Sequence, residues 1–411
     1  MASANDSHGL TEESADLVDD AVRLRRKLHA HPEIGLDLPR TRDTICEQID
    51  NLGITVTHGI SSTSVVGLLE GSRPGPTILL RADMDALPMP EDTGVEFSST
   101  VEGVMHACGH DLHVAMLVGA ARLLSARQND FAGRVLFMFQ PGEEGHGGAQ
   151  HMIDEGLFNV PNLSSGEASP VTGAFAIHAT PNLPGSVFAL KGGTMMASAD
   201  VLTIVVTGRG GHGSAPHNAL DPVPVACEIA LALQTMITRT IDVFDPAVVS
   251  VTQIMAGTTN NVIPETATIV GTIRAVSERT RTKVHDGIRR VAEGIAAAHD
   301  AHVSVDVAHG YPVTVNDPGY AQFVTSVAKG VVGDRSVVAM PNPVMGAEDF
   351  SYVLHNVAGA MAFLGCSPAG VDPFSAAPNH SNRVYFDEAP MAVGMAMYAS
   401  VALAHLSAAE V

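Results

Sequence analysis

Apolar residues recur at helical spacing near the start of the chain and then fall into short, nearly continuous runs. The segment ADLVDDAVRLRRKLHAH (15–31) has the helical period and is followed by Pro32, so it predicts a helix that ends there. A second helix is predicted over 41–53. The apolar runs at 64–70 and 76–85 predict buried strands.

Strands and helices continue to alternate up to Gly192. A helix is predicted over 111–126, followed by strands that begin at Gly133 and at Gly173. This alternation is typical of an α/β fold whose sheet contains parallel stretches. The polar stretch 159–170 is predicted to be a surface loop and not a domain boundary.

The pattern changes after Gly192. From about 193 to 307 the predicted order is β-α-β-β-α-β, which is the order of the ferredoxin-like fold. We therefore predict a ferredoxin-like domain, 193–307, inserted into a larger α/β domain that consists of 1–192 and 308–411. A chain of 411 residues is long for a single core, which agrees with two domains.

Composition narrows the classes of protein that remain. Hydrophobic residues make up 45% of the chain, enough for a large core. The chain has 23 Lys+Arg against 44 Asp+Glu, a net charge of −21 and no basic run, so no nucleic-acid partner is expected. The polar, acidic start predicts no signal peptide, and no apolar run is long enough to predict a membrane span. The four cysteines are far apart, so we expect no disulfides and a cytoplasmic location.

Polar side chains gather where the predicted strands end. The residues at these ends are Asp83 and Asp85, Glu143 and Glu144, and His178. In α/β sheets ligands bind beyond the carboxyl ends of the strands, and helix starts lie at the same edge. The segment MHACGHDLH (105–113), just before a predicted helix, is therefore expected at this edge too. Four segments thus bring Asp, Glu, Cys and His together.

This set of side chains favours a metal site. Cys108 stands at a helix entry, where the helix dipole favours thiolate. Thiolate, imidazole and carboxylate suit zinc or a neighbouring first-row metal. Of the adjacent carboxylates, Glu144 can bind metal while Glu143 accepts a proton from metal-bound water. His106 and His113 fit better as packing groups or as partners of ligands.

Other interpretations stay open at this point. Cys108 could pack as a small core residue, or act as a nucleophile activated by the neighbouring histidines. Glu143 and Glu144 could be a solvated surface pair, but a cysteine mechanism would leave them without a role. A metal-binding or regulatory protein with an inactive site is a further alternative.

Eight motifs that occur in order resemble one family over about 20–400, nearly the whole chain. They are HAHPEIG, RADMDALP, MHACGHDLH, QPGEEGHGGA, GGHGSAPH, TNNVIPETATIVGTIR, MGAEDF and NHS. Together they resemble the N-acyl-amino-acid amidohydrolases, which include hippurate hydrolase, auxin-conjugate hydrolases and bacterial aminoacylases. This is a branch of the dinuclear metallopeptidases related to aminoacylase and glutamate carboxypeptidase. The resemblance implies a zinc-exopeptidase-like catalytic domain with a mixed sheet, and a dimerisation and lid role for 193–307.

The resemblance also implies roles for individual residues in the catalytic domain. Five residues match the metal ligands of the family: Cys108, His110, Glu144, His178 and His380. Glu143 matches the general base. In the wider superfamily an Asp bridges the metals at the position aligned with Cys108, and one His ligand corresponds to Asp83. Cys108 is therefore a candidate bridging ligand, and Asp83, Asp85 and Glu348 are possible partners of the ligands.

In the inserted domain, His212 matches the residue that polarises the scissile carbonyl across a dimer interface. Asn261 and Arg274 match positions near the substrate. Arg274 could hold the carboxylate of the amino-acid part with both arms of its guanidinium. An ion pair of Arg274 with Glu265 on the strand surface is the alternative.

The function implied is the hydrolysis of N-acyl amino acids to a carboxylic acid and a free amino acid. The enzyme is expected to be a homodimer with two divalent metal ions per subunit. Manganese or zinc is the first expectation, and cobalt or nickel also suits such ligands. A dipeptidase or carboxypeptidase that uses the same site is the alternative.

Overall fold

The computed structural model describes residues 4–159 and 169–408, which form two compact units. The first unit is Met1–Met195, Val315–Pro341 and Tyr352–Val411, and the second is Met196–Thr314 and Asn342–Ser351. The predicted inserted domain is 193–307, whereas the second unit covers 196–314 and also includes 342–351, a segment whose local pattern did not indicate this grouping. Most of the predicted loop 159–170 lies outside the described residues.

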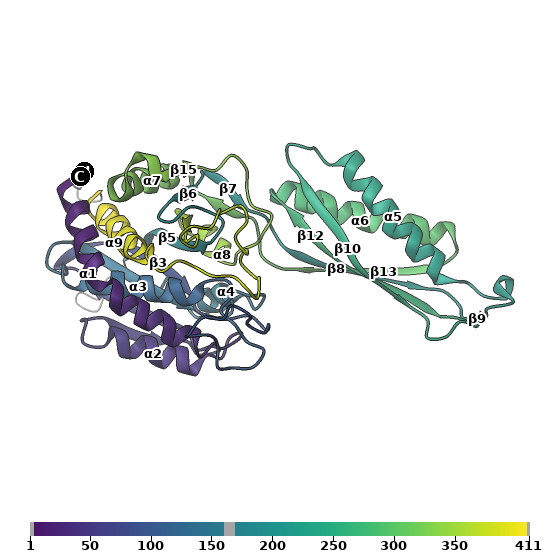
Figure 1. Cartoon of the computed structure of the whole chain (residues 1–411). Helices are drawn as coiled ribbons and strands as arrows, with labels where there is room; N and C mark the ends of the chain where they lie inside the picture. The colour runs from purple at the N-terminus through teal and green to yellow at the C-terminus, as the bar shows by residue number, and fades with distance from the viewer. Residues whose placement is uncertain (1–3, 160–168, 409–411) are drawn as a thin grey trace. The chain divides into compact units, whose positions relative to one another are not determined.

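The first unit is built on an eight-stranded mixed sheet with the order β1-β2-β4-β3-β5-β16-β6-β15 (Figure 1). The bounds are β1 Thr55–His58, β2 Val65–Glu70, β3 Arg73–Asp83, β4 Ala132–Gln140, β5 Val171–Thr180, β6 Phe188–Leu190, β15 Val337–Ala339 and β16 Gly359–Gly365. Strand β3 runs parallel to β4 and β5, and β16 runs parallel to β5. All nine residues of β4 are buried, as expected for a central parallel strand covered on both faces. The predicted mixed α/β sheet is confirmed.

Helices α3 and α9 pack on the central strands of this sheet, and α1 packs on both helices (Figure 1). The helices of the first unit are α1 Ala4–His29, α2 Pro39–Ile49, α3 His110–Ser125, α4 Gly148–Asp154, α7 Pro318–Val332, α8 Ser351–Leu354 and α9 Met391–Ala408, with the 3₁₀ turn η2 Asp334–Ser336. Helix α1 begins well before the predicted start at residue 15. Its first turns are polar, so the apolar period did not reveal them.

Helix α9 is long and apolar enough to cross a membrane by length and composition alone, and it is the one described helix of which this is true. In the structure, 61% of this helix is buried within the protein. Contacts with α1, α3, α7 and the central strands account for that burial. These contacts are typical of a core helix in a globular protein.

Two glycine–methionine contacts join α3 and α9 in a reciprocal way. Met395 of α9 fills the space over Gly119 of α3, and Met116 of α3 fills the space over Gly394 of α9. A Cβ atom at Gly119 would lie 2.0 Å from the Met395 Sδ, and one at Gly394 would lie 2.1 Å from the Met116 Sδ. Because both methionines are fully buried, neither can move away without disturbing the core.

Gly119→Ala is therefore expected to lower the free energy of unfolding by about 1–2 kcal/mol, although alanine is the better helix former. The matched control is Gly294→Ala in a helix of the second unit, where an added Cβ meets no atom within 4 Å. That change should raise stability by about 0.5–1 kcal/mol. Urea unfolding of both variants measures the contrast, and stabilisation by both would contradict the tight packing of α3 on α9.

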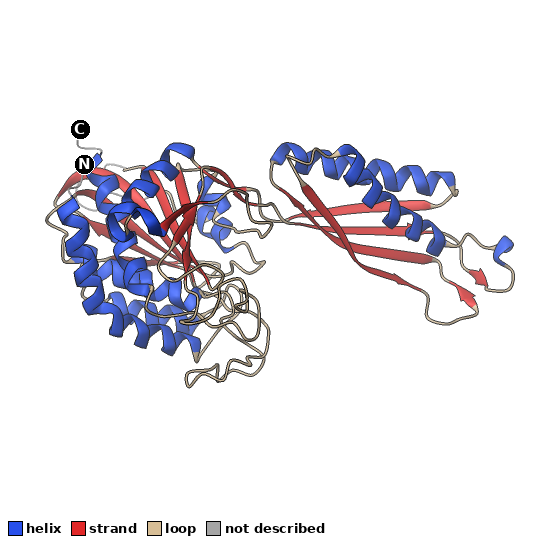
Figure 2. Cartoon of the chain, turned by 45° about the horizontal axis from the view of Figure 1, so that its top comes forward, coloured by secondary structure: helices blue, strands red, loops and turns tan. Residues whose placement is uncertain are grey.

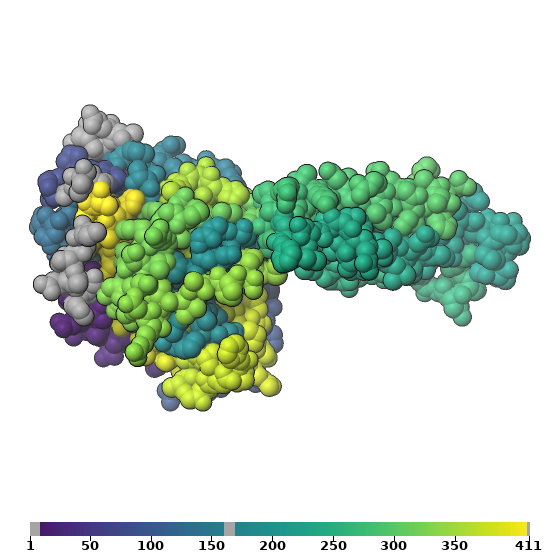
Figure 3. Space-filling view, turned by 90° about the horizontal axis from the view of Figure 1, so that it is seen from above, coloured from purple at the N-terminus to yellow at the C-terminus, as the bar shows by residue number. Residues whose placement is uncertain are grey.

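The second unit is a four-stranded antiparallel sheet with the order β10-β12-β8-β13. In chain order its elements are β8 Asp200–Thr207, α5 Pro222–Thr240, β10 Ala247–Ala256, β12 Thr266–Ala275, α6 Glu278–Ala298 and β13 His302–His309. This is a β-α-β-β-α-β order. Helices α5 and α6 cover one face of the sheet and lie side by side on the helical face shown in Figure 3. The buried residues of the sheet alternate, as in Leu202, Ile204 and Val206 of β8, and pack against these helices.

Smaller elements complete the chain. They are β7 Gly193–Met196, β9 Gly211–His212, the 3₁₀ turn η1 Pro216–Asn218, β11 Val262–Ile263 and β14 Thr314–Asn316. Strands β9 and β11 pair in a small antiparallel sheet of the second unit. The chain passes from the first unit to the second within β7 and returns within β14.

A buried carboxylate at the start of β8 anchors the second unit. Asp200 accepts hydrogen bonds from Arg281 Nε at 2.9 Å, His285 Nε2 at 2.8 Å and the Gly310 N–H at 3.1 Å. Burial alone would raise the pKa of Asp200, but these partners lower it below its usual range. A carboxyl with a lowered folded-state pKa stabilises the fold above its unfolded pKa, and this contribution is lost as the pH falls.

Asp200→Asn is expected to lower the free energy of unfolding of the second unit by about 3 kcal/mol at pH 7, because the buried Arg281 loses its closest carboxylate and keeps only the half-exposed Glu278 as an ion-pair partner. The difference from wild type should shrink as the pH falls below about 4, where the unfolded Asp binds its proton. Urea unfolding between pH 7 and pH 3 tests this. A difference that stays constant over that range would contradict the role of the Asp200 charge.

Candidate metal centre

Loops gather at the carboxyl ends of the central strands of the first unit (Figure 2). Asp83 is the last residue of β3, Glu143 follows the end of β4 and His178 lies near the end of β5. Helix α3 begins at His110. The ligand atoms of Cys108, His110 and His178 lie within 4.8 Å of one another, which places the start of α3 at the same edge. The structure thus brings together at one rim the residues that follow these strands.

Backbone carbonyls determine which nitrogen of two histidines faces this cluster. His110 Nδ1 lies 2.8 Å from the Asp85 carbonyl oxygen, and His178 Nδ1 lies 2.8 Å from the Ala179 carbonyl oxygen. Because a carbonyl oxygen only accepts, each Nδ1 carries a hydrogen, and Nε2 of the neutral ring keeps its lone pair. His178 Nε2 lies 3.5 Å from Cys108 Sγ, and His110 Nε2 is buried without a hydrogen-bond partner. A metal ion would use both lone pairs.

A second group of candidate ligands contains Cys108, Glu144 and His380, whose ligand atoms also lie within 4.8 Å of one another. His380 Nε2 is 3.3 Å from Cys108 Sγ and 3.0 Å from Glu144 Oε1. His380 has φ +68°, a left-handed conformation that costs a non-glycine residue about 1–2 kcal/mol. Its N–H donates to the Ala107 carbonyl oxygen at 2.8 Å. Cys108 is thus the member shared by both groups.

The electrostatics of the cluster favour positive charge. Burial alone would lower the pKa of His110, but Asp83 and Cys108 raise it well above its usual range. Hydrogen bonds to Cys108 and Glu144 raise the pKa of His380 to about 10. The same negative groups would attract a divalent cation. All five predicted ligands lie in this cluster, and a thiol, three imidazoles and a carboxylate fit zinc, manganese or another first-row metal.

Asp85 holds the turn that carries both glutamates. Its Oδ1 accepts the Glu143 N–H and its Oδ2 accepts the Glu144 N–H, each at 3.0 Å. Asp85 is 1% exposed, so this hydrogen-bonded turn is held from inside the protein. Through these two hydrogen bonds Asp85 orients Glu143 and Glu144.

Asp83 and His113 form a second buried pair beneath the cluster. His113 Nδ1 donates to Asp83 Oδ1 at 2.5 Å, and His113 Nε2 accepts the Ala179 N–H at 2.7 Å. Both ring nitrogens of His113 are therefore used within the protein, which leaves no lone pair for a metal. Arg81 Nη1 donates to Asp83 Oδ2 at 2.7 Å. Arg81 was not among the site residues predicted from the sequence, although a charged residue inside the apolar run TILLRAD indicates a buried partner.

The remaining predicted residues lie in the second unit. Glu348 is buried, and its Oε1 accepts the Phe350 N–H at 3.0 Å. His212 is exposed, and its Nδ1 accepts the Ser214 N–H at 3.1 Å. Because that nitrogen accepts, the hydrogen of the neutral ring is on Nε2, which is then a donor. The Gly213 N–H donates to the Asn261 carbonyl oxygen at 2.8 Å, so Asn261 lies beside His212.

Arg274 lies at the other end of β12 from this pair. Its Nη1 donates to Thr272 Oγ1 at 2.6 Å and to the Ile273 carbonyl oxygen at 3.1 Å. Glu265 directly precedes β12, whereas Arg274 is its penultimate residue, so the alternative ion pair between them is not formed. The interpretation of Arg274 as a partner of Glu265 is therefore wrong. Its guanidinium is half-buried, and burial lowers its pKa.

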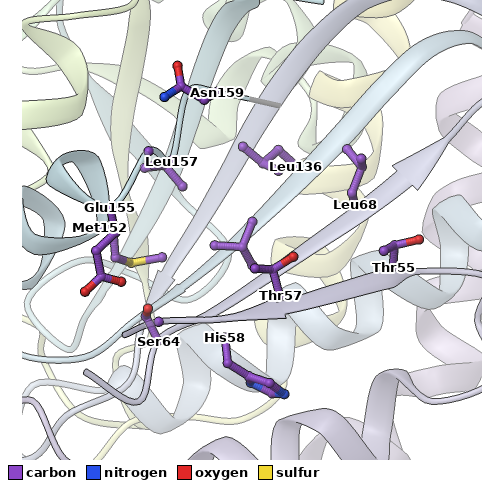
Figure 4. Close-up of a pocket in the computed structure, with 13 residues that line it drawn as sticks. Thr55, Thr57, His58, Ser64, Leu68, Leu136, Met152, Glu155, Leu157 and Asn159 are labelled. Carbon is purple, nitrogen blue, oxygen red and sulfur yellow. The ribbon is translucent and has the colours of Figure 1, made fainter. Parts of the chain in front are cut away.

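A cavity of about 320 Å³ lies elsewhere in the first unit, along the edge strand β1 (Figure 4). It is lined by Thr55, Thr57, His58, Ser64, Leu68, Leu136, Met152, Glu155, Leu157 and Asn159, among others. None of the predicted site residues lines it. The carboxylate of Glu155 already accepts the N–H groups of Ile60 and Ser61 at 2.8 and 2.7 Å. This cavity therefore has no part in the chemistry predicted for the rim.

Residues 79–404 match the family model described as Peptidase family M20/M25/M40. The chain belongs to this family. This membership confirms the predicted relationship to the dinuclear metallopeptidases and the predicted zinc-exopeptidase-like fold class, and it makes the chain a metallopeptidase-like hydrolase.

Several M20 relatives align with almost the whole chain. Hippurate hydrolase of Campylobacter jejuni is 36% identical and covers 97% of this chain and 99% of its own. N-acetylcysteine deacetylase of Bacillus subtilis is 35% identical, with 93% and 96% covered. Thermostable carboxypeptidase 1 of Saccharolobus solfataricus is 39% identical, with 96% and 97% covered. Relatives with amidohydrolase names agree with the predicted branch of the M20 family.

A solved M20 structure supports the presence of metal. The YXEP protein of Bacillus subtilis, described as a dinuclear metal-binding peptidase of the M20 family, is 31% identical with a TM-score of 0.81. It covers 96% of this chain and 99% of its own. Metal binding is therefore a property of the family to which this chain belongs, and the cluster around Cys108 contains groups of described residues that could hold a metal ion.

Proposed function

We propose that this M20 protein hydrolyses the amide bond of N-acyl amino acids to a carboxylic acid and a free amino acid. The observation that carries the proposal is the cluster of Cys108, His110, Glu144, His178 and His380 with Glu143 beside it. These five ligands would hold two divalent ions. Relatives named hippurate hydrolase and N-acetylcysteine deacetylase support the substrate class.

Each residue of the first unit has a defined task in this proposal. When bound, the metal ions lower the pKa of a water molecule and polarise the amide carbonyl. Glu143 accepts a proton from the attacking water and donates it to the leaving amine. Asp85 keeps Glu143 in place through the hydrogen bonds to the turn. His110 and His178 present Nε2 because backbone carbonyls hold their Nδ1–H groups.

We also propose that Cys108 would help to hold both ions. It is the member common to the group with His110 and His178 and to the group with Glu144 and His380. A thiolate has enough lone pairs to bind two cations at once. Manganese and zinc are the ions proposed first, since either accepts this mixture of donors.

The second unit supports the proposal of a homodimer. His212 pairs with Val262 of β11, just before β12 begins, whereas Arg274 lies near the end of β12, so about 25 Å of strand separates the two residues. A single small substrate cannot contact both within one subunit. We propose that His212 serves the site of the other subunit, where its Nε2–H would stabilise the developing oxyanion. The edge strand β10, which exposes Val248, Ile254 and Met255, is a suitable surface for twofold pairing.

A mixed dimer tests the exchange of His212. Glu143→Ala and His212→Ala should each be inactive alone, but a dimer with one subunit of each has one intact site. Random mixing makes half of the dimers mixed, each with one active site of two, so activity should return to about a quarter of wild type. The two variants are unfolded and refolded together, with wild type as the control. Mixtures that stay at the level of the parents would show that His212 does not act across the dimer.

The substrate class is tested by kcat/KM on a panel of N-acetyl, N-benzoyl and long-chain N-acyl amino acids, with manganese, zinc, cobalt or nickel added to the metal-free enzyme. Dipeptides with a free α-amino group form the comparison set. The carboxypeptidase names of two relatives keep a carboxypeptidase or dipeptidase as the second candidate. A consistent preference for the dipeptides would replace the amidohydrolase proposal with that candidate.

The cytoplasmic location stays a prediction.

A further inference from the structure

We infer that Asn379 is a positioning residue of the metal centre, and that its side-chain amide joins the three chain segments that supply Cys108, His178 and His380. The inference rests on the proposed metal site. The three segments are far apart in sequence, since they precede α3, end β5 and lie in the loop before α9. Contacts between the segments must therefore hold them together, and the Asn379 amide makes such contacts.

Three contacts of the Asn379 side chain carry this inference. Asn379 Nδ2 donates to the Cys108 carbonyl oxygen at 3.1 Å and to the Ala179 carbonyl oxygen at 3.1 Å. It also lies 3.9 Å from Cys108 Sγ, within reach of a hydrogen bond to sulfur. Asn379 is the residue directly before His380. One amide therefore contacts the segments of two candidate ligands and belongs to the segment of a third.

The Ala179 peptide is the second junction in this arrangement. Its carbonyl oxygen accepts from Asn379 and also from His178 Nδ1 at 2.8 Å. Its N–H donates to His113 Nε2. The amide of Asn379 thus acts on the same carbonyl that determines the orientation of the His178 ring. Loss of the amide would free this peptide to rotate and turn His178 Nε2 away from Cys108.

The backbone of His380 gives a further reason for an anchor. This residue is in the left-handed conformation and its side chain is 54% exposed, so little packing holds it. Its N–H donates to Ala107, next to Cys108. The Asn379 amide adds a second hydrogen bond to the same segment, at the Cys108 carbonyl oxygen. Together the two connections keep a strained, exposed residue directed at Cys108 Sγ.

The contact with sulfur predicts a spectroscopic effect that a purely structural residue would not produce. A hydrogen-bond donor near a metal-bound thiolate stabilises the lone pairs of sulfur. Charge transfer from that sulfur to cobalt(II) then requires more energy. Removal of the donor should shift the thiolate-to-cobalt absorption band to longer wavelength.

The experiment compares Asn379→Leu with Asn182→Leu. Leucine keeps the branched shape of asparagine but donates no hydrogen bond. Asn182 is the matched control, because its Nδ2 also donates to two loop carbonyl oxygens, those of Pro373 and Ala376, at 2.9 and 3.1 Å. Metal-free protein of each variant is titrated with cobalt(II) in competition with a chelator, and the thiolate band is recorded.

We expect Asn379→Leu to weaken cobalt binding by about 10–100-fold and to shift the thiolate band to longer wavelength. Asn182→Leu should change neither quantity. Unchanged affinity and band in Asn379→Leu, or equal changes in the two variants, would overturn the inference. If circular dichroism shows that metal-free Asn379→Leu is unfolded, Asn379→Ala removes the same donors from a smaller side chain and is held to the same outcomes. A wild-type protein that binds cobalt without a thiolate band would instead contradict the proposed metal site.

Discussion

Glu143→Gln is expected to lower the turnover of an N-acyl amino acid by about 10²–10⁴-fold while the protein keeps its metal. Glutamine has the size of glutamate but cannot accept the proton of the attacking water. The change should leave the turn intact, because the N–H groups of Glu143 and Glu144 are what bind Asp85. Turnover per mole of metal, measured with elemental analysis of the same samples, gives the result.

Glu144→Gln is the matched control, since it changes the neighbouring carboxylate in the same turn. Glu144 lies 3.0 Å from His380 and belongs to the candidate ligand group around Cys108. Its replacement should lower the metal content of the protein. If Glu143→Gln loses metal but keeps turnover per metal, the roles given to the two glutamates are reversed.

Cys108→Ala is expected to abolish activity, because the sulfur is shared by both groups of candidate ligands. The variant is dialysed against a chelator and reloaded with metal, and its content of both ions should then fall. Replacement of a residue that binds only one ion would lower the content of that ion alone. Cys46→Ala is the control, since Cys46 is a free cysteine of α2 outside the cluster. Full metal content in Cys108→Ala would contradict the bridging role.

The same experiment separates the metal site from a cysteine nucleophile. Chelation should remove all activity of wild type, and one first-row metal should restore it. Alkylating agents should have little effect on the metal-loaded enzyme, because Cys108 is buried and its sulfur is bound. Full activity of rigorously metal-free protein would exclude the proposed mechanism.

The edge of the sheet at which the site lies could be predicted, because the sequence shows which polar residues follow buried strands. The apolar runs before Asp83, Glu143 and His178 identify buried parallel strands, and parallel strands end at one edge. Residue type then suggested the chemistry. The assignment of individual ligands came from the resemblance, which supplied His380 from a segment with no strand or helix around it.

Other features depend on contacts that no periodicity records. The grouping of 342–351 with the second unit follows from tertiary packing, which local pattern does not encode. The tautomers of His110 and His178 depend on single backbone carbonyls. The role inferred for Asn379 depends on the carbonyl oxygens of Cys108 and Ala179, which are 71 residues apart in sequence. The alternative ion pair of Arg274 with Glu265 is not formed for the simpler reason that β12 is long enough to keep the two residues far apart.

The position of β16 in the first sheet has a consequence for biosynthesis. This strand, Gly359–Gly365, pairs with β5 on one side and β6 on the other, so it is inserted between strands that end about 170–180 residues earlier in the chain. While the ribosome is still adding the intervening residues, the edge of β5 has no partner and can pair with another chain. Folding of the first unit must wait until this strand emerges, and pairings over such long sequence separations form slowly. Nascent chains that stall before Gly359 should therefore aggregate and bind no metal, and a chaperone that shields β5 would be most useful during that interval.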